Sequence, residues 1–326
     1  MAAKSTASWL VGDIGGTNAR FALVEAGGGP PREARKLPRA SFNSVAEAIE
    51  DYLRETGAPK PGGIALAAAG PVVDGAVRFT NRGWSTSETA LRGLGFEKAV
   101  VVNDFAALAQ AAPTLGPADF QVIGPPIEGE ADATVCVLGP GTGFGVGALA
   151  RRSGAAIPVS GEGGHVGFAP DGEVEIEIER RLTARHGRVS WERILSGPGL
   201  AALHDLLHEI DGKPAPGLDA AEITSRALAR DPACDATVER FCGMLGTAAG
   251  DFAMAFGARG GVWLTGGVAH AVAPLLDASP FRARFEDKGR MAAYVAAIPT
   301  RLILDSLAAL RGLAAMVQST NARSIT

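Results

Sequence analysis

The sequence predicts an α/β protein made of two domains with the same plan. Its 326 residues are enough for two domains that each have a core of their own. Two apolar strand patterns, which begin at Trp9 and at Thr134, are each followed by a glycine-rich turn and a second strand pattern. Each hairpin opens a stretch in which strand and helix patterns alternate, so the chain is expected to repeat one architecture.

The first glycine-rich turn follows the strand pattern Trp9–Val11 and spans residues 12–17, GDIGGT. A dinucleotide-binding loop would have the spacing GxGxxG and lead into a helix, and a P-loop would have a lysine before Ser or Thr. Residues 18–24, NARFALV, instead show a rough alternation that predicts a strand. The turn is therefore expected to close a β-hairpin.

Glycine turns of this kind suit phosphate groups, because a residue without Cβ lets backbone N–H groups approach phosphate oxygens. Asp13, at the end of the strand, would then face a phosphate-bound Mg²⁺. A plain hairpin turn is the alternative. The second hairpin, residues 134–151 (TVCVLGPGTGFGVGALAR), repeats the plan and favours a nucleotide held between the two halves.

Further elements follow in the first half of the chain. Ser44–Thr56 has apolar residues at helical spacing, and Gly63–Ala69 is an apolar strand pattern. Ser85 and Glu88 have the spacing of a capping box, which predicts that a helix begins there. Ala99–Val102 predicts another strand, with an alanine-rich helix after it.

Asn103 and Asp104 stand at the C-terminal end of the strand predicted at Ala99–Val102. In open α/β sheets, ligands bind at the C-terminal ends of the strands, so this polar pair is a candidate for contact with a substrate. The alternative is a structural role in which Asp104 caps the helix that follows.

The second half contains polar candidates in two places. Its expected boundary is Pro113–Pro126, a segment rich in proline and glycine. The glycine-rich loop GEGGHVG carries Glu162 and His165, and a short helix that carries Glu192 is expected at Val189–Leu195. Exposure to solvent is the alternative for each of these side chains.

A helix is expected from Pro198, and His204 and His208 lie four residues apart on it. No glutamate follows the first histidine as in a zinc-binding HExxH pattern, so both histidines are expected at the surface rather than on a metal. Later in the chain, Asp235–Ala258 predicts a long helix. Gly261–Gly267 is expected to be the final strand, ending in two glycines that could support a purine or ribose, before a last helix at residues 305–318.

Composition and charge exclude some classes of protein. The chain has 47% apolar and 20% charged residues, a net charge of −4 and no block of like charge, whereas a nucleic-acid-binding protein normally has a basic face. Neither a signal-peptide core nor a membrane-spanning run is recognisable, so a soluble, cytoplasmic protein is expected. The cysteines have no metal-type spacing and are expected to be buried, reduced thiols: Cys136, Cys234 and Cys242.

Taken together, these stretches resemble the bacterial ATP-dependent glucokinases, members of the superfamily of sugar kinases, heat-shock ATPases and actin. The resemblance implies two ribonuclease-H-like α/β domains, of the actin-like ATPase type, that flank a cleft. The small domain would comprise residues 1–113 and a C-terminal helix at 304–326, and the large domain residues 114–303. The matching segments run in order and cover most of the chain: residues 10–23, 68–72, 80–84 (TNRGW), 102–109, 139–147, 160–170, 192–200, 265–267 and 285–291.

The resemblance also implies roles for individual residues. Asp104 would be the catalytic base at the 6-hydroxyl of the sugar. The other hydroxyls would be bound by Asn103, Glu162, His165 and Glu192. The ATP phosphates would lie against Gly12, Asp13, Ile14, Gly15, Gly16 and Thr17 in the first turn, with Asp13 near Mg²⁺, and against Thr142 and Gly143 in the second. The adenosine would lie beside Gly266 and Gly267.

The implied activity is phosphorylation of glucose by Mg-ATP, the first step of glycolysis, in a cytoplasmic homodimer that binds neither nucleic acid nor membrane. Kinases for fructose, mannose or an N-acetylhexosamine are alternatives, because loop residues near C2 of the sugar decide the substrate. A non-catalytic sugar sensor is a further alternative, although both glycine hairpins and Asp104 are retained. Polyphosphate is an alternative phosphoryl donor.

The sequence departs from the family pattern in two respects. Residues 305–312 read DSLAALRG where the family often has Asn-Pro-Gly-Leu-Leu-Gly, which leaves open how the last helix packs. The related repressor–kinase group has a zinc-binding cysteine cluster after its GEGGH segment, whereas this sequence has no cysteine between His165 and Cys234. We therefore expect no structural zinc, and stoichiometric zinc in a metal analysis would contradict this.

Overall fold

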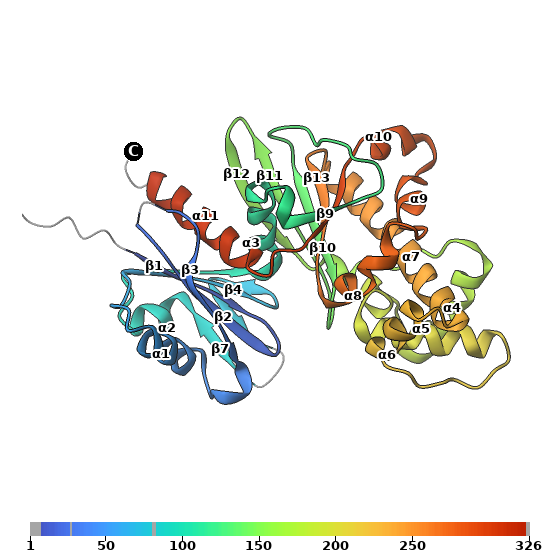
Figure 1. Cartoon of the computed structure of the whole chain (residues 1–326), viewed down its shortest axis with the longest axis horizontal. Helices are drawn as coiled ribbons and strands as arrows, with labels where there is room; N and C mark the ends of the chain where they lie inside the picture. The colour runs from blue at the N-terminus through green and yellow to red at the C-terminus, as the bar shows by residue number, and fades with distance from the viewer. Residues whose placement is uncertain (1–7, 27, 80–82, 324–326) are drawn as a thin grey trace, which may run out of the picture. The chain divides into compact units, whose positions relative to one another are not determined.

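The computed structural model describes residues 8–26, 28–79 and 83–323, which form two compact units (Figure 1). The described residues of the first unit lie within Met1–Gly116, Pro158–Ser160 and Asp305–Thr326. Those of the second unit lie within Pro117–Ile157 and Gly161–Leu304. In the described part of the chain, no helix is both long and apolar enough to cross a bilayer.

The first unit is built on a five-stranded mixed sheet in the order β3-β2-β1-β4-β8. Strand β1 pairs antiparallel with β2 and parallel with β4, so the predicted hairpin across residues 12–17 is confirmed. The strands are β1 (Trp9–Ile14), β2 (Asn18–Val24), β3 (Arg32–Pro38), β4 (Gly63–Ala68) and β8 (Lys98–Asn103).

Alternation along β1 divides the core of this unit between the two faces of the sheet. Leu10 and Ile14 pack on the side of α1 (Val45–Thr56), whereas Trp9 and Val11 pack on the side of α11 (Ala308–Arg323). Figure 1 shows α1 and α2 on one side of the sheet and α11 and α3 on the other. Helix α1 ends at Thr56 as predicted, where left-handed Gly57 follows, but starts one residue later than predicted, because Ser44 is its N-cap and accepts from the backbone of Glu47.

The predicted capping box at Ser85 is wrong. Ser85 pairs with Arg78 in a small three-stranded sheet formed by β5 (Val72–Val73), β6 (Ala76–Arg78) and β7 (Ser85–Ser87). Helix α2 (Glu88–Gly93) starts only after β7, with Ser87 accepting from the backbone N–H of Ala90. Ser85, the first residue of the predicted capping box, is therefore part of a strand. In the observed helix the residue at N3 is Ala90, whose side chain cannot accept the backbone N–H of Ser87 as a glutamate in a capping box would.

The second unit contains a six-stranded sheet in the order β12-β11-β10-β13-β14-β9. Its first five strands have the same order as the sheet of the first unit, with β10 antiparallel to β11 and parallel to β13, so the expected duplication is confirmed. The strands are β9 (Phe120–Ile123), β10 (Val135–Pro140), β11 (Phe144–Arg152), β12 (Ala155–Gly161), β13 (Gly261–Leu264) and β14 (Thr300–Ile303).

Two of these strands correct the sequence-based expectations. β9 lies inside the segment expected only to be a domain boundary, and β14 follows the strand expected to be the last. The two strands pair with each other, antiparallel. The guanidinium carbon of Arg301 on β14 lies 4.9 and 5.0 Å from the ring centroids of Phe120 and Trp263, which contact each other edge to face. Each strand is therefore stabilised by contacts that are distant in sequence.

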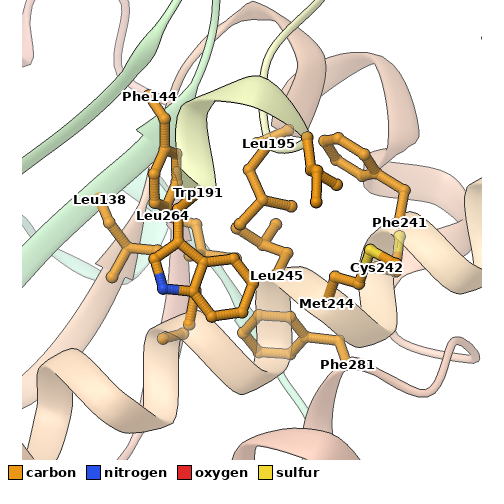
Figure 2. Close-up of a cluster of buried hydrophobic side chains, with 14 of the residues drawn as sticks. Leu138, Phe144, Trp191, Leu195, Phe241, Cys242, Met244, Leu245, Leu264 and Phe281 are labelled. Carbon is orange, nitrogen blue, oxygen red and sulfur yellow. The ribbon is translucent and has the colours of Figure 1, made fainter. Parts of the chain in front are cut away.

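Helices and the sheet enclose the main core of the second unit, part of which appears in Figure 2. The long predicted helix is confirmed as α7, which starts earlier than expected because Asp231 caps it. Gly246 of α7 lets the backbone of α9 approach, since a Cβ there would lie 2.9 Å from the carbonyl carbon of Phe281. The helices are α4 (Gly172–His186), α5 (Gly197–Ile210), α6 (Ala220–Leu228), α7 (Pro232–Phe256), α8 (Gly267–Leu276), α9 (Phe281–Glu286) and α10 (Ala292–Ala296).

His204 on α5 is not at the surface, as had been expected, but is only 1% exposed. Its Nδ1 lies 2.8 Å from the hydroxyl of Thr237 on α7. This hydroxyl donates to the carbonyl of Ala233, so it accepts from His204, which places the ring proton on Nδ1. All three cysteines are buried and unpaired, as predicted.

Because burial, and then the neighbouring His208, lower the pKa of His204, stability should depend on pH. The unfolded chain takes up a proton at this residue more readily than the folded chain, so stabilisation by neutral His204 is complete above pH 6.5, its unperturbed value, and is lost below it. In urea unfolding, the wild type should lose more stability than His204→Gln between about pH 7.5 and about pH 5.5. Equal losses in the two proteins would contradict this assignment.

Candidate functional site

The first glycine turn connects β1 to β2, and Gly15 closes it by donating its N–H to the carbonyl of Asn18 at 3.0 Å. Three of the predicted phosphate-binding residues, Gly12, Asp13 and Ile14, lie within β1 itself. A Cβ on Gly12 would lie 2.8 Å from ring atoms of Phe21, and the side chain of Ile14 is fully buried in the core. Packing therefore explains why a glycine stands at position 12 and an isoleucine at position 14. Either residue could contact a ligand only through its backbone.

Asp13 is the last residue but one of β1 and lies opposite Arg20 of β2, which donates to its Oδ2 at 3.0 Å. Burial raises the pKa of the Asp13 carboxyl, and the charge and hydrogen bond of Arg20 oppose that rise. Mg²⁺ in nucleotide sites commonly takes one or two carboxylates, with phosphates and water supplying the remaining oxygens. One carboxylate beside a glycine turn fits that requirement. Within the described ranges, no group of three or more metal-binding side chains occurs.

The predicted polar pair lies at the junction of β8 and α3 (Asp104–Ala111). Asn103 is the N-cap of α3: its Oδ1 accepts from Phe105 and Ala106, at 2.9 and 3.3 Å, and its Nδ2 donates to the carbonyl of Gly70 at 3.2 Å. The alternative in which Asp104 caps the helix is therefore wrong. Asn103 keeps one Nδ2 proton for a ligand, whereas its oxygen is committed to the helix.

Asp104 is the first residue of α3, half-buried, at the C-terminal edge of the sheet. Its Oδ1 accepts the N–H of Phe105 at 3.0 Å. This carboxyl group lies at the positive end of the helix dipole of α3. Asp104 is thus held in one place by a rigid strand–helix junction, as a residue that must orient a substrate hydroxyl should be.

The second glycine turn, between β10 and β11, is held by backbone bonds on both sides. Gly141 donates to the carbonyl of Gly143 at 2.8 Å and accepts from Gly197 at 2.8 Å. Beside it, Gly266 has φ 96°, and a Cβ there would lie 2.9 Å from the carbonyl carbon of Pro140. Gly267 begins α8 with its backbone nitrogen 4.0 Å from the position of a Cβ on Gly141.

The parallel pairing of β10 with β13 therefore brings two distant glycine segments together, the turn around Gly143 and the N-terminus of α8. Backbone N–H groups at a turn and at a helix N-terminus both favour anions. The described geometry is thus consistent with the predicted placement of Thr142, Gly143, Gly266 and Gly267 at a nucleotide, which stays a prediction.

His165 and Glu192 also come together in the second unit, although sequence periodicity could not place either. Glu192 Oε1 lies 3.8 Å from His165 Nε2, and its Oε2 accepts the N–H of Phe144 at 2.9 Å. A bridge between Gly167 and Ser190 joins the two loops. Glu162 directly precedes the short helix that carries His165 and is exposed. Of the matching segment at 80–84, residues 80–82 lie outside the described residues.

Gly143→Ala tests whether Glu192 and the second turn work as a unit. A Cβ on Gly143 would lie 3.2 Å from the carboxyl carbon of Glu192 and overlap its Oε2, so this carboxylate must move. We expect the KM of the variant for the hexose that the resemblance implies to rise about 10-fold, because small displacements of positioning groups are costly. Gly243→Ala is the matched control, since a Cβ there makes an ordinary 3.5 Å contact with Arg284. Equal KM values in the two variants would contradict the coupling.

The chain is similar to known proteins over most of its length. A family model described as glucokinase matches residues 10–320. A glucokinase of Caulobacter sp. (strain K31) is 48% identical over 94% of this chain and 93% of its own length, and one of Chromobacterium violaceum is 44% identical over 94% and 88%. The crystal structure of a glucokinase from an Antarctic psychrotroph is 37% identical, with a TM-score of 0.86 over 96% of this chain and 99% of that one.

A more distant structure, a glucokinase of the ROK family from Streptomyces griseus in complex with glucose and AMPPNP, is 20% identical with a TM-score of 0.64. It covers 96% of this chain and 99% of its own. At that identity the likeness concerns the fold alone, and it agrees with the predicted architecture of two related α/β domains.

Proposed function

Because the chain belongs to the glucokinase family, we propose that it transfers the terminal phosphoryl group of ATP to the 6-hydroxyl of D-glucose, giving glucose 6-phosphate and ADP. The observation that carries this proposal is the 48% identity to a glucokinase over 94% of the chain. Both glycine turns and Asp104 lie within residues 10–320, which the family model matches. The reaction is the first step of glycolysis.

Asp104 acts as the general base in this proposal. Phosphoryl transfer needs the attacking hydroxyl to be oriented in line with the phosphorus atom and to lose its proton. A carboxylate fixed at the start of α3 can accept that proton while the strand–helix junction holds it in position. General base catalysis of this kind typically contributes about 10²- to 10⁴-fold in rate.

The remaining sugar hydroxyls are assigned to Asn103, Glu162, His165 and Glu192. Each hydroxyl both donates and accepts, so carboxylates and an amide proton can read its position. A sugar that lacks or inverts a hydroxyl would leave these groups unpaired and bind less well. Asn103 can donate its second Nδ2 proton to a sugar hydroxyl. Glu192 can accept from a sugar hydroxyl through its Oε1 atom.

The nucleotide is assigned to the two glycine turns and to the N-terminus of α8. Backbone N–H groups of the segment Gly12–Thr17, and of Thr142 and Gly143, would bind the phosphates, and Gly266 and Gly267 would lie beside the adenosine. Asp13 would hold Mg²⁺ through its carboxylate. Mg²⁺ would neutralise part of the phosphate charge. The hydrogen bond from Arg20 keeps the Asp13 side chain in place.

The experiment that tests this proposal is a coupled assay for sugar 6-phosphate with the purified chain and Mg²⁺. Glucose, fructose, mannose and N-acetylglucosamine are compared as acceptors, and ATP, ADP and polyphosphate as donors. The highest kcat/KM is expected for glucose with ATP. Preference for another hexose or for polyphosphate would replace the named substrate. ATP turnover that does not depend on any sugar would overturn the proposal.

The family resemblance also implies an oligomeric state and a cellular location. Members of the family are commonly homodimers, and we propose a cytoplasmic homodimer here as well. The buried thiols of all three cysteines suit a reducing compartment. Light scattering of the purified chain tests the dimer, for which twice the mass of 33.3 kDa is expected.

A further inference from the structure

We propose that Arg39 is a positioning residue for the nucleotide. Its buried guanidinium fixes the Gly15–Gly16 turn in a conformation that presents backbone N–H groups to the phosphates of ATP. The inference rests on the proposed function, since it concerns the phosphate-binding turn of that same site.

The side chain of Arg39 reaches the turn directly. Arg39 begins a short 3-10 helix after β3, at residues 39–41, and is only 1% exposed. Its Nη1 donates to the carbonyl oxygens of Gly15 and Gly16, at 2.9 and 3.3 Å. Its backbone N–H donates to the carbonyl of Thr17 at 2.9 Å. Three successive carbonyls of the turn therefore bind this one residue.

Two aromatic rings hold the guanidinium in place. Its central carbon lies 4.3 Å from the ring centroid of Trp84 and 5.0 Å from that of Phe79. Both rings are buried in the core of the first unit. Cation–π contacts favour the charged group over the ring faces and restrict its rotation, so the donors stay aimed at the turn.

Because the peptide bond is planar, these contacts also determine where the neighbouring N–H groups point. In a planar trans peptide, the carbonyl and the N–H of the next residue point in opposite directions. Drawing the carbonyl of Gly15 toward Arg39 turns the N–H of Gly16 away from it, and the carbonyl of Gly16 does the same for the N–H of Thr17. Two donors thus face the side opposite Arg39.

The restraint by Arg39 matters because the turn contains two glycines. The Gly15–Gly16 pair has access to backbone conformations that other residues avoid, so the turn would otherwise lose conformational entropy when it binds phosphate. The positive charge of Arg39 behind the turn adds to the attraction of anions. Arg39 acts through the backbone and is not itself assigned a contact with ATP.

Equilibrium binding tests the inference independently of turnover. Titration calorimetry of wild type, Arg39→Gln and Arg39→Lys measures the affinities for Mg-ADP and for glucose separately. We expect Arg39→Gln to bind Mg-ADP about 10- to 100-fold more weakly, the range expected for loss of hydrogen bonds from a charged donor. Arg39→Lys keeps the charge and one donor direction and should recover part of this loss. The glucose affinity of both variants should stay near that of the wild type.

Arg282→Gln in the second unit is the matched control. Arg282 is also a buried arginine that donates to carbonyls, those of Ala296 and Ile298 at 2.9 and 2.8 Å, and lies over the ring of Phe285. Its loss should reduce stability without a selective effect on Mg-ADP.

Wild-type affinity for Mg-ADP in the Arg39 variants, or equal losses for ADP and glucose, would overturn the inference. If Arg39→Gln does not fold, the Lys variant decides by the same two affinities. Lack of glucose-dependent turnover in the wild type would instead count against the proposed function alone.

Discussion

Asp104→Asn is expected to lower kcat for glucose phosphorylation by about 10²- to 10⁴-fold, because the amide cannot accept the proton of the 6-hydroxyl. The substitution keeps the size of the side chain and an oxygen that can accept the N–H of Phe105. Glucose affinity should therefore change by less than about threefold, so that the loss appears in the chemical step rather than in binding. Steady-state kinetics and a separate titration with glucose measure the two quantities.

Glu88→Gln is the matched control for this variant. Glu88 is the first residue of α2, as Asp104 is of α3, and both helices belong to the first unit. Its replacement removes an equivalent charge from a helix N-terminus and should leave kcat unchanged. An Asp104→Asn variant with kcat near that of the wild type would remove Asp104 from the role of base.

Gly312→Ala is expected to destabilise the first unit by about 3 kcal/mol, at the upper end of the usual cost of overpacking. A Cβ on Gly312 of α11 would overlap the carbonyl oxygen of Ala107 on α3 and lie 2.7 Å from its carbonyl carbon. The obstacle is helix backbone, which cannot rotate away as a side chain can. Urea unfolding followed by tryptophan fluorescence measures the loss.

Gly93→Ala, at the end of α2, is the matched control, because a Cβ there meets nothing within 4 Å. Alanine favours helix, so this variant should be as stable as the wild type or more stable by up to about 1 kcal/mol. Similar stabilities for the two variants would contradict close packing of α11 on α3.

The Gly312 contact also answers the question left open by the atypical segment 305–312. Although the family pattern is lost there, a glycine remains where the last helix crosses α3. Asp305 holds the entry to α11 by accepting the N–H of Leu307 at 2.9 Å and pairing with Arg311 at 3.1 Å. Side-chain hydrogen bonds thus begin this helix without the family's proline and glycine.

Sequence periodicity predicted the elements that carry their own signal. The two hairpins, α1 and α7 combine regular apolar spacing with glycine or proline at their ends, so local preference and tertiary packing agree. The repeated hairpins predicted a duplicated architecture, which the matching strand order of the two sheets confirms. These features predicted a duplicated α/β protein, and the resemblance to glucokinases supplied the ribonuclease-H-like type of the two domains.

Elements stabilised by distant partners could not be predicted in the same way. β9 and β14 have four residues each: β9 pairs only with β14 among the described strands, and β14 lies between β9 and β13. The burial of His204 depends on Thr237, which is 33 residues later in the chain. Arg39 follows an exposed strand and precedes a polar stretch, so no local pattern marks it as buried.

The candidate site shows the same division. Asn103 and Asp104 were recognisable because they follow a clear strand, but which of the two caps α3 depends on side-chain rotamers that periodicity does not reveal. The hydrogen bond from Phe144 to Glu192 joins segments 48 residues apart. The sequence signal for this contact is the glycine at position 143, because any side chain there would displace Glu192.

A structure of the chain with glucose and a non-hydrolysable ATP analogue is the most direct test of the central claim, that Asp104 deprotonates the sugar hydroxyl which attacks ATP. The 6-hydroxyl is predicted to lie within about 3.2 Å of a carboxylate oxygen of Asp104. The phosphates should lie against backbone N–H groups of Gly16 and Thr17. A hexose bound away from Asp104, or phosphates bound away from both glycine turns, would contradict the claim.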